Sequence, residues 1–98
     1  MSENRIVQTG LEARQVLENE AYRAAMDALK RQIIDQWKAC PVRDKEGQLL
    51  LLQLAKLSDK FESILRGYIE SGKDASRRID LRNERTESAL KRGLRAVL

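Results

Sequence analysis

The sequence predicts an all-α protein, and three observations carry this prediction. Apolar residues recur at steps of three and four along two long segments, which is the spacing of one face of a helix. Charged residues make up 35% of the chain and aromatic residues only 4%, a composition typical of helical, surface-rich proteins. Pro41, the one proline, interrupts the helical pattern between the two segments. We therefore expect an antiparallel helical hairpin with a short N-terminal helix and a basic C-terminal helix.

The first two helices are predicted from their capping residues. The sequence "TGLE" at 9–12 fits a capping box, in which the Thr9 hydroxyl accepts a first-turn N–H and Glu12 reaches back. A short helix is expected over 11–18, and Asn19 is suited to cap the next one. The apolar residues of that second helix are Tyr22, Met26, Leu29, Ile33 and Trp37. Pro41 lacks an N–H and should end it.

A third helix is predicted to begin after Asp44, which is a favourable N-cap residue. Its apolar residues alternate in steps of four and three, and this is the seam of a coiled coil. They are Leu50, Leu54, Leu57, Phe61, Ile64 and Tyr68. We expect this seam to pack against the second helix across the turn, with Trp37 near Leu50 and Met26 near Phe61.

Four consecutive leucines occupy positions 49–52. Successive residues of a helix point about 100° apart, so the four side chains cover most of its circumference. Leaving a leucine in water forfeits roughly 1.5–3 kcal/mol of possible burial. Cover could come from the other helices or from another subunit, and a chain of 98 residues often gains core by oligomerisation. The predicted homo-oligomer interface consists of Leu49, Leu51, Leu52, Trp37 and Tyr68.

Gly72 is the predicted boundary between a hairpin core, residues 1–72, and a basic helical extension, residues 73–98. It suits the position after a helix end, and Asp74 or Ser76 could cap a fourth helix. A continuous helix is the competing prediction, because an internal glycine costs only about 1 kcal/mol. The core holds 11 basic and 11 acidic residues, and the extension holds 8 basic and 4 acidic ones. The whole net charge of +4 therefore lies in the extension.

Five arginines share one side of the predicted C-terminal helix. They are Arg78, Arg82, Arg85, Arg92 and Arg95. Guanidinium groups match phosphate oxygens, so this side could contact nucleic acid. It lacks aromatic residues for base stacking, and acidic residues interrupt it. A solvated helix face, an acidic protein partner and DNA therefore remain alternatives. A membrane surface is disfavoured, because the apolar face of this C-terminal helix contains neither Trp nor Phe.

Residues that carry enzyme chemistry are scarce in this sequence. Histidine is absent, and with it the usual general base and metal ligand. Cys40 is the one cysteine, so it offers neither a zinc site nor an internal disulfide. No Gly-rich phosphate loop occurs. We expect no enzyme activity, no catalytic residue, no cofactor or metal, and no small-molecule substrate.

The expected location is a reducing cytoplasm. The chain has no apolar run of 18 residues that would span a membrane. Its N-terminal sequence "MSENRIVQTG" lacks the apolar core of a signal peptide. A lone cysteine also fits a compartment without structural disulfides.

One stretch of the chain carries a family resemblance. A helix ends in Trp37-Lys38, a Cys40-Pro41 turn follows, and Arg43-Asp44-x-Glu46-Gly47 leads into a Leu-rich helix. In residues 11–73 the chain thus resembles small helical proteins that tailed bacteriophages encode among their DNA-packaging and virion-structure genes. The resemblance implies phage origin and expression in the host cytoplasm, with incorporation into the virion left open. It does not extend to the basic segment.

These observations lead to one expected function and two alternatives. We expect a non-enzymatic bacteriophage protein that acts by helix-mediated assembly in virion morphogenesis or structure. Its partners would be further copies of itself and, at the C-terminal helix, an acidic protein or DNA. The alternatives are a DNA-packaging accessory resembling a small terminase subunit and a phage inhibitor of a host DNA-processing enzyme.

Overall fold

The protein is all-α, as the sequence predicts. The computed structural model describes the backbone of residues 2–97 and the side chains of residues 2–95. Within this range the chain forms three helices and no strand: α1 (Glu3–Glu18), α2 (Glu20–Ala39) and α3 (Lys45–Val97).

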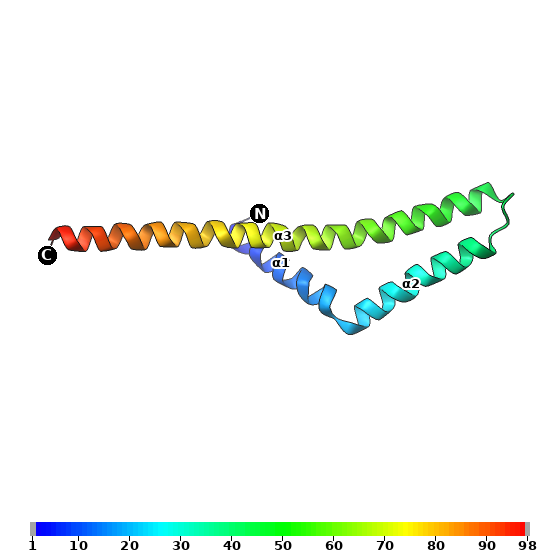
Figure 1. The fold of residues 1–98 in the computed structure, drawn as a ribbon, viewed down its shortest axis with the longest axis horizontal. Coiled ribbons are helices and arrows are strands. Elements are labelled where there is room, and N and C mark those ends of the chain that lie inside the picture. The colour runs from blue at the N-terminus through cyan, green and yellow to red at the C-terminus, as the bar shows by residue number, and fades with distance from the viewer. Residues whose placement is uncertain (1, 98) are drawn as a thin grey trace.

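The molecule is elongated because α3 runs along its whole length. A helix of 53 residues is about 80 Å long, which accounts for the longest dimension of 83 Å. Helix α1 starts beside the middle of α3, and α2 returns towards the N-terminal end of α3 (Figure 1). The C-terminal part of α3 extends alone beyond α1 (Figure 1). The contacts between helices are therefore confined to one part of the molecule.

Helix α1 begins eight residues earlier than the sequence predicts. The Ser2 hydroxyl accepts the N–H of Arg5 at 3.3 Å and caps the helix, so the predicted capping box at Thr9 is wrong. Thr9 and Glu12 lie inside α1. The physical reason is tertiary: the added turns of α1 place Gly10 and the residues before it against α3.

Three further predicted helix ends are confirmed. The Asn19 side-chain oxygen accepts the N–H of Tyr22 at 2.9 Å and caps α2. Helix α2 ends at Ala39, directly before the Cys40-Pro41 pair. The Asp44 carboxylate accepts the N–H of Gly47 at 3.0 Å and caps α3. Local hydrogen-bonding chemistry thus determines these three ends.

Helix α3 continues through Gly72, so the predicted fourth helix is wrong and the competing prediction of a continuous helix is confirmed. Gly72 is buried where α1 crosses α3. A Cβ placed on Gly10 would lie 2.8 Å from the carbonyl oxygen of Tyr68 and 3.1 Å from Cα of Gly72. The glycine pair therefore permits a close helix crossing. No helix break separates residues 1–72 from the rest.

The face of α3 that packs inside the molecule lies one residue beyond the predicted seam. Its buried or half-buried residues also follow steps of four and three: Leu51, Ala55, Ser58, Glu62, Leu65, Ile69, Gly72, Ser76 and Ile79. We call this set the inner face. Ala55, Ser58 and Gly72 are small, which lets α1 and α2 approach. The expected packing of the larger seam against α2 is therefore wrong, apart from Phe61, whose ring centroid lies 6.4 Å from that of Tyr22.

The hydrophobic core of the described chain is thin. Its buried apolar residues are Ala13, Ile33, Leu51 and Ala75. Only two of these are large side chains. Most of the bulky apolar residues of α3 are consequently left at the surface.

Candidate assembly interface

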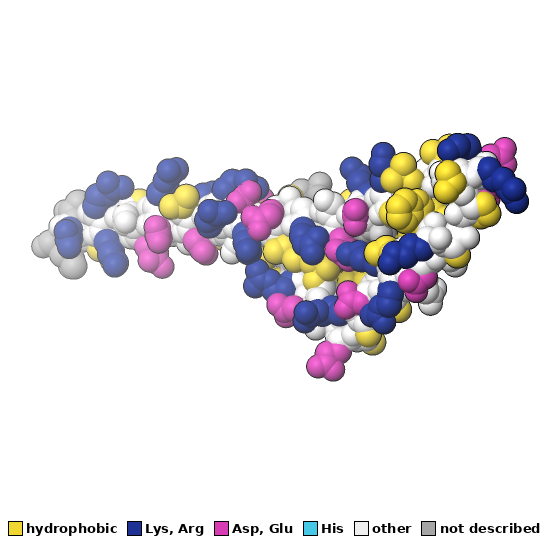
Figure 2. Space-filling view, turned by 45° about the vertical axis from the view of Figure 1, so that its right-hand side comes forward, with side chains coloured by type: hydrophobic (Ala, Val, Ile, Leu, Met, Phe, Trp, Pro, Cys, Tyr) yellow, Lys and Arg dark blue, Asp and Glu magenta, His cyan; other side chains and the backbone are white. Residues whose placement is uncertain are grey.

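The main candidate interface is the seam of α3 that faces solvent. We call Leu50, Leu54, Leu57, Phe61, Ile64 and Tyr68 the apolar stripe. Their exposed fractions are 58%, 41%, 64%, 49%, 43% and 45% respectively. Hydrophobic side chains gather over the part of the surface formed by all three helices, and charged side chains cover the protruding part (Figure 2). A regular heptad line of half-exposed large residues is the surface that coiled-coil partners bury.

A second apolar surface lies beside the turn between α2 and α3. It is a groove of about 570 Å³. Its lining includes Ile34, Trp37, Leu49, Leu51 and Leu52. Four of the five predicted interface residues thus come together here, whereas Tyr68 lies on the apolar stripe.

Leu51 is much less exposed than the other predicted interface residues that line the groove. Its exposed fraction is 8%, compared with 55% for Leu49 and 50% for Leu52. Leu51 and Ile33, which is equally buried, line the same groove from α3 and α2. The cover for Leu51 is therefore within the chain, and it belongs to the core instead of to an exposed surface.

An ion pair between Lys30 and Glu62 ties α2 to α3. Lys30 Nζ lies 2.9 Å from the Glu62 carboxylate, and Arg66 lies 3.4 Å from it on the other side. The hydrogen bond from Lys30 lowers the pKa of Glu62, although partial burial opposes this effect. The same hydrogen bond raises the pKa of Lys30. Glu62, on the inner face, was not predicted as a structural residue, because sequence spacing relates it only to Arg66.

The five predicted arginines fall into two groups. Arg78 lies 3.9 Å from the Glu3 carboxylate, and Arg82 also pairs with Glu3, so both are tied to the start of α1. Arg85, Arg92 and Arg95 lie farther along α3, and none of them forms an ion pair with another described side chain. Every residue from 80 to 95 is exposed. We call residues 80–95 the basic arm.

The apolar stripe and the arginines share one line along α3. The steps of four and three that run from Leu50 to Tyr68 continue through Ser71 and Ala75. They then reach Arg78, Arg82, Arg85, Ala89 and Arg92 in the same register. One face of α3 is therefore apolar in its first half and basic in its second.

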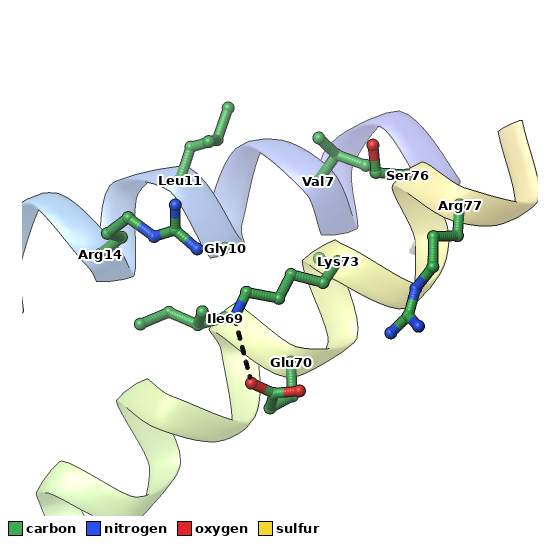
Figure 3. Close-up of a pocket in the computed structure, with 10 residues that line it drawn as sticks. Val7, Gly10, Leu11, Arg14, Ile69, Glu70, Lys73, Ser76 and Arg77 are labelled. Carbon is green, nitrogen blue, oxygen red and sulfur yellow. Dashed lines mark ion pairs between the residues drawn. The ribbon is translucent and has the colours of Figure 1, made fainter. Parts of the chain in front are cut away.

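A further hollow lies where α1 crosses α3 (Figure 3). It measures about 570 Å³ and is lined by Gly10, Leu11 and Arg14 of α1 and by Ile69, Lys73 and Arg77 of α3, among others. Lys73 reaches towards Glu70 and pairs with it at 3.5 Å (Figure 3). The polar lining of the hollow consists of four long charged side chains and one hydroxyl, from Arg14, Glu70, Lys73, Arg77 and Ser76.

Cys40 lies in the turn with its thiol near Asp44. Its Sγ is 3.8 Å from a carboxylate oxygen of Asp44. Partial burial raises the pKa of the Cys40 thiol, and the negative charge of Asp44 raises it further. The thiol therefore stays protonated at neutral pH, a state of low nucleophilicity.

The described residues contain no group of three or more His, Cys, Asp or Glu side chains arranged to hold a metal ion. In the same range, none of the helices is sufficiently long and apolar to cross a membrane. Comparison with protein-family models, with curated proteins and with solved structures finds nothing that matches the chain.

Proposed function

We propose that this protein is a non-enzymatic helical assembly protein whose copies associate through the apolar stripe of α3. The observation that carries the proposal is the exposure of six large apolar side chains in one regular heptad line. Isolated surface leucines are ordinary, but a continuous apolar patch usually marks an interface. The thin core adds to this argument, since association would bury the surface that folding leaves in water.

In this proposal the α2–α3 pair acts as an antiparallel helical hairpin and presents the stripe. The Lys30–Glu62 ion pair and the Tyr22–Phe61 contact hold the two helices together and support this role. The exposed leucines of the groove, Leu49 and Leu52, would form a second contact between copies in a larger assembly.

The proposed setting is bacteriophage morphogenesis, with expression in the host cytoplasm. Its support is the resemblance of residues 11–73 to small helical phage proteins. In that setting the basic arm would contact an acidic virion protein or packaged DNA.

The test is the oligomeric state in solution, measured by size-exclusion chromatography with light scattering at two protein and two salt concentrations. We expect a discrete oligomer that survives high salt, because apolar contacts are not screened by ions. Leu57→Glu should shift it to monomer and keep its helical circular dichroism, since Leu57 is 64% exposed. Ser63→Glu adds the same charge at an exposed position off the stripe and should leave the oligomer intact. A monomer under all four conditions would contradict the proposal.

A second candidate function, DNA binding by the arm, rests on one specific observation. Arg85, Arg92 and Arg95 project on the isolated end of α3 without ion-pair partners among the described residues. If these three neutralise three phosphates, log Kd for duplex DNA should change with log salt with a slope of about 3. Fluorescence anisotropy of a labelled duplex measures this slope. Salt-independent binding, or an unchanged slope after replacement of the three arginines by glutamine, would exclude this function.

A further inference from the structure

We infer that the occupant of the apolar stripe is a second copy of this chain, lying antiparallel on α3 and centred on Asp59. This inference rests on the proposed function and adds the orientation of the two copies. In this register Leu50 lies opposite Tyr68 of the partner subunit, Leu54 opposite the partner's Ile64, and Leu57 opposite the partner's Phe61. Each of these pairs joins the two alternating heptad positions, which is the arrangement of antiparallel coiled coils.

The length of the open face supports the antiparallel orientation. The residues of the apolar stripe are exposed from Leu50 to Tyr68. Ala75, which lies on the same line seven residues later, is fully buried. Gly72 contacts the backbone of α1 just before Ala75, and Glu3 of α1 pairs with Arg78 just after it. Helix α1 therefore covers this face of α3 at Ala75, so a partner helix cannot lie there.

A second helix can cover the open part only if it ends near this crossing. An antiparallel partner meets this condition, because its α3 begins at Lys45, which would lie opposite residue 73. A parallel partner does not, because its α3 would continue across α1 for more than twenty residues.

The charge of α3 also supports the antiparallel orientation. The line of the stripe continues into Arg78, Arg82, Arg85 and Arg92. In a parallel pair each of these arginines would face its own copy, and like charges placed opposite each other are destabilising. In an antiparallel pair the two basic arms extend from opposite ends of the dimer, so these repulsive layers do not form. The layers at Arg85 and Arg92 matter most, because Arg78 and Arg82 are already paired with Glu3.

The size and shape of the side chains fit two copies. Each of the six side chains exposes roughly half of its surface, so the stripe offers on the order of 500 Å² per copy and about 1,000 Å² per pair, the area at which specific interfaces begin. The antiparallel register places both Phe61 and Tyr68 opposite a leucine. A parallel register would place each ring against its own copy, which packs large side chains against large ones.

The experiment is a distance measurement between spin labels in the full-length chain. Lys73→Cys is labelled in a Cys40→Ser background, because Lys73 lies off the stripe and is half exposed. With a rise of 1.5 Å per residue, the antiparallel dimer places the two labels about 40 Å apart, whereas a parallel one places them about 20 Å apart. Double electron–electron resonance separates these distances, and dilution with unlabelled protein should remove the signal.

A second variant tests the charge argument independently. Arg85→Gln should leave the dimer dissociation constant unchanged within about twofold in the antiparallel arrangement, because Arg85 then faces no copy of itself. A distance near 20 Å, alone or beside the longer one, or a clearly tighter Arg85→Gln dimer would overturn the orientation and leave self-assembly standing. A monomer in every condition would overturn both this inference and the proposed function.

Discussion

The Glu62 carboxylate joins α2 to α3, because it pairs with Lys30 of α2 and with Arg66 of its own helix. Its side chain is only 13% exposed, so the pair with Lys30 is better shielded than the other ion pairs of the described chain. Since the folded state lowers the pKa of Glu62, its contribution to stability is present above the pKa of the unfolded chain. That contribution is lost as the pH falls through the folded value.

We therefore predict that Glu62→Gln lowers stability at pH 7 and that the difference from wild type shrinks as the pH is lowered towards 2, through the pKa of an ordinary glutamate and then through the lower folded pKa of Glu62. The measurement is the urea midpoint of unfolding for both proteins across this pH range. Glu70→Gln is the matched control, because Glu70 lies on the same helix and is 67% exposed, so its effect should be small at every pH. Parallel pH profiles of the Glu62→Gln variant and the wild type would show that the pair does not form.

At the scale of the helix, α3 carries two regular heptad lines one residue apart. The sequence predicts the helix itself, its cap at Asp44 and the turn at Pro41, because these depend on neighbouring residues. Which line faces inward could not be predicted. The larger apolar side chains belong to the line with Leu57 and Phe61, and large apolar side chains are the ones expected to be buried. Packing against α1 instead favours the line with small residues, since only that line permits the approach of Gly10 to Gly72.

The missed arrangement did leave a signal in the sequence. Ala55, Ser58, Gly72 and Ser76 follow the same steps of four and three as the larger residues beside them. A line of small residues on one helix, with Gly10 on another, is typical of a close helix crossing. The pairing of Glu3 with Arg78 and Arg82 could not be predicted in the same way, because it depends on where α1 starts.

The difference between the two lines predicts different effects for two adjacent leucines: a loss of folding stability at one and a loss of association at the other. Leu51→Ala should lower the free energy of unfolding by about 2–3 kcal/mol, because it removes a buried side chain and leaves a cavity. Leu50→Ala should change the free energy of unfolding of the monomer by less than about 1 kcal/mol, since Leu50 is 58% exposed, and should weaken association instead. Urea unfolding at a protein concentration that keeps the chain monomeric separates the two effects. Equal losses from both variants would mean that the inner face does not lie at Leu51.

At the scale of the whole molecule, the chain has two parts that differ in their contacts between helices, and no helix end separates them. Residues up to about 82 contribute to the packing of α1 and α2 on α3, whereas the later part of α3 extends alone (Figure 1). An isolated helix is held only by its own backbone hydrogen bonds and by local side-chain pairs. The predicted division at residue 72 therefore lies about ten residues before the point where contacts between helices end.

We predict that removal of residues 86–98 leaves both the unfolding midpoint and the self-association of the chain unchanged, because residues 86–95, the described part of this segment, are exposed and form no ion pair with α1. The mean residue helicity should also stay nearly constant, since the shortened α3 keeps its packed part. Circular dichroism during thermal unfolding and light scattering measure these quantities on the two chains. A lower midpoint at equal concentration would mean that the arm packs on the body or on a partner. If instead the shortened chain associates more tightly, repulsion between basic arms opposes assembly, and the arms of neighbouring copies then lie side by side.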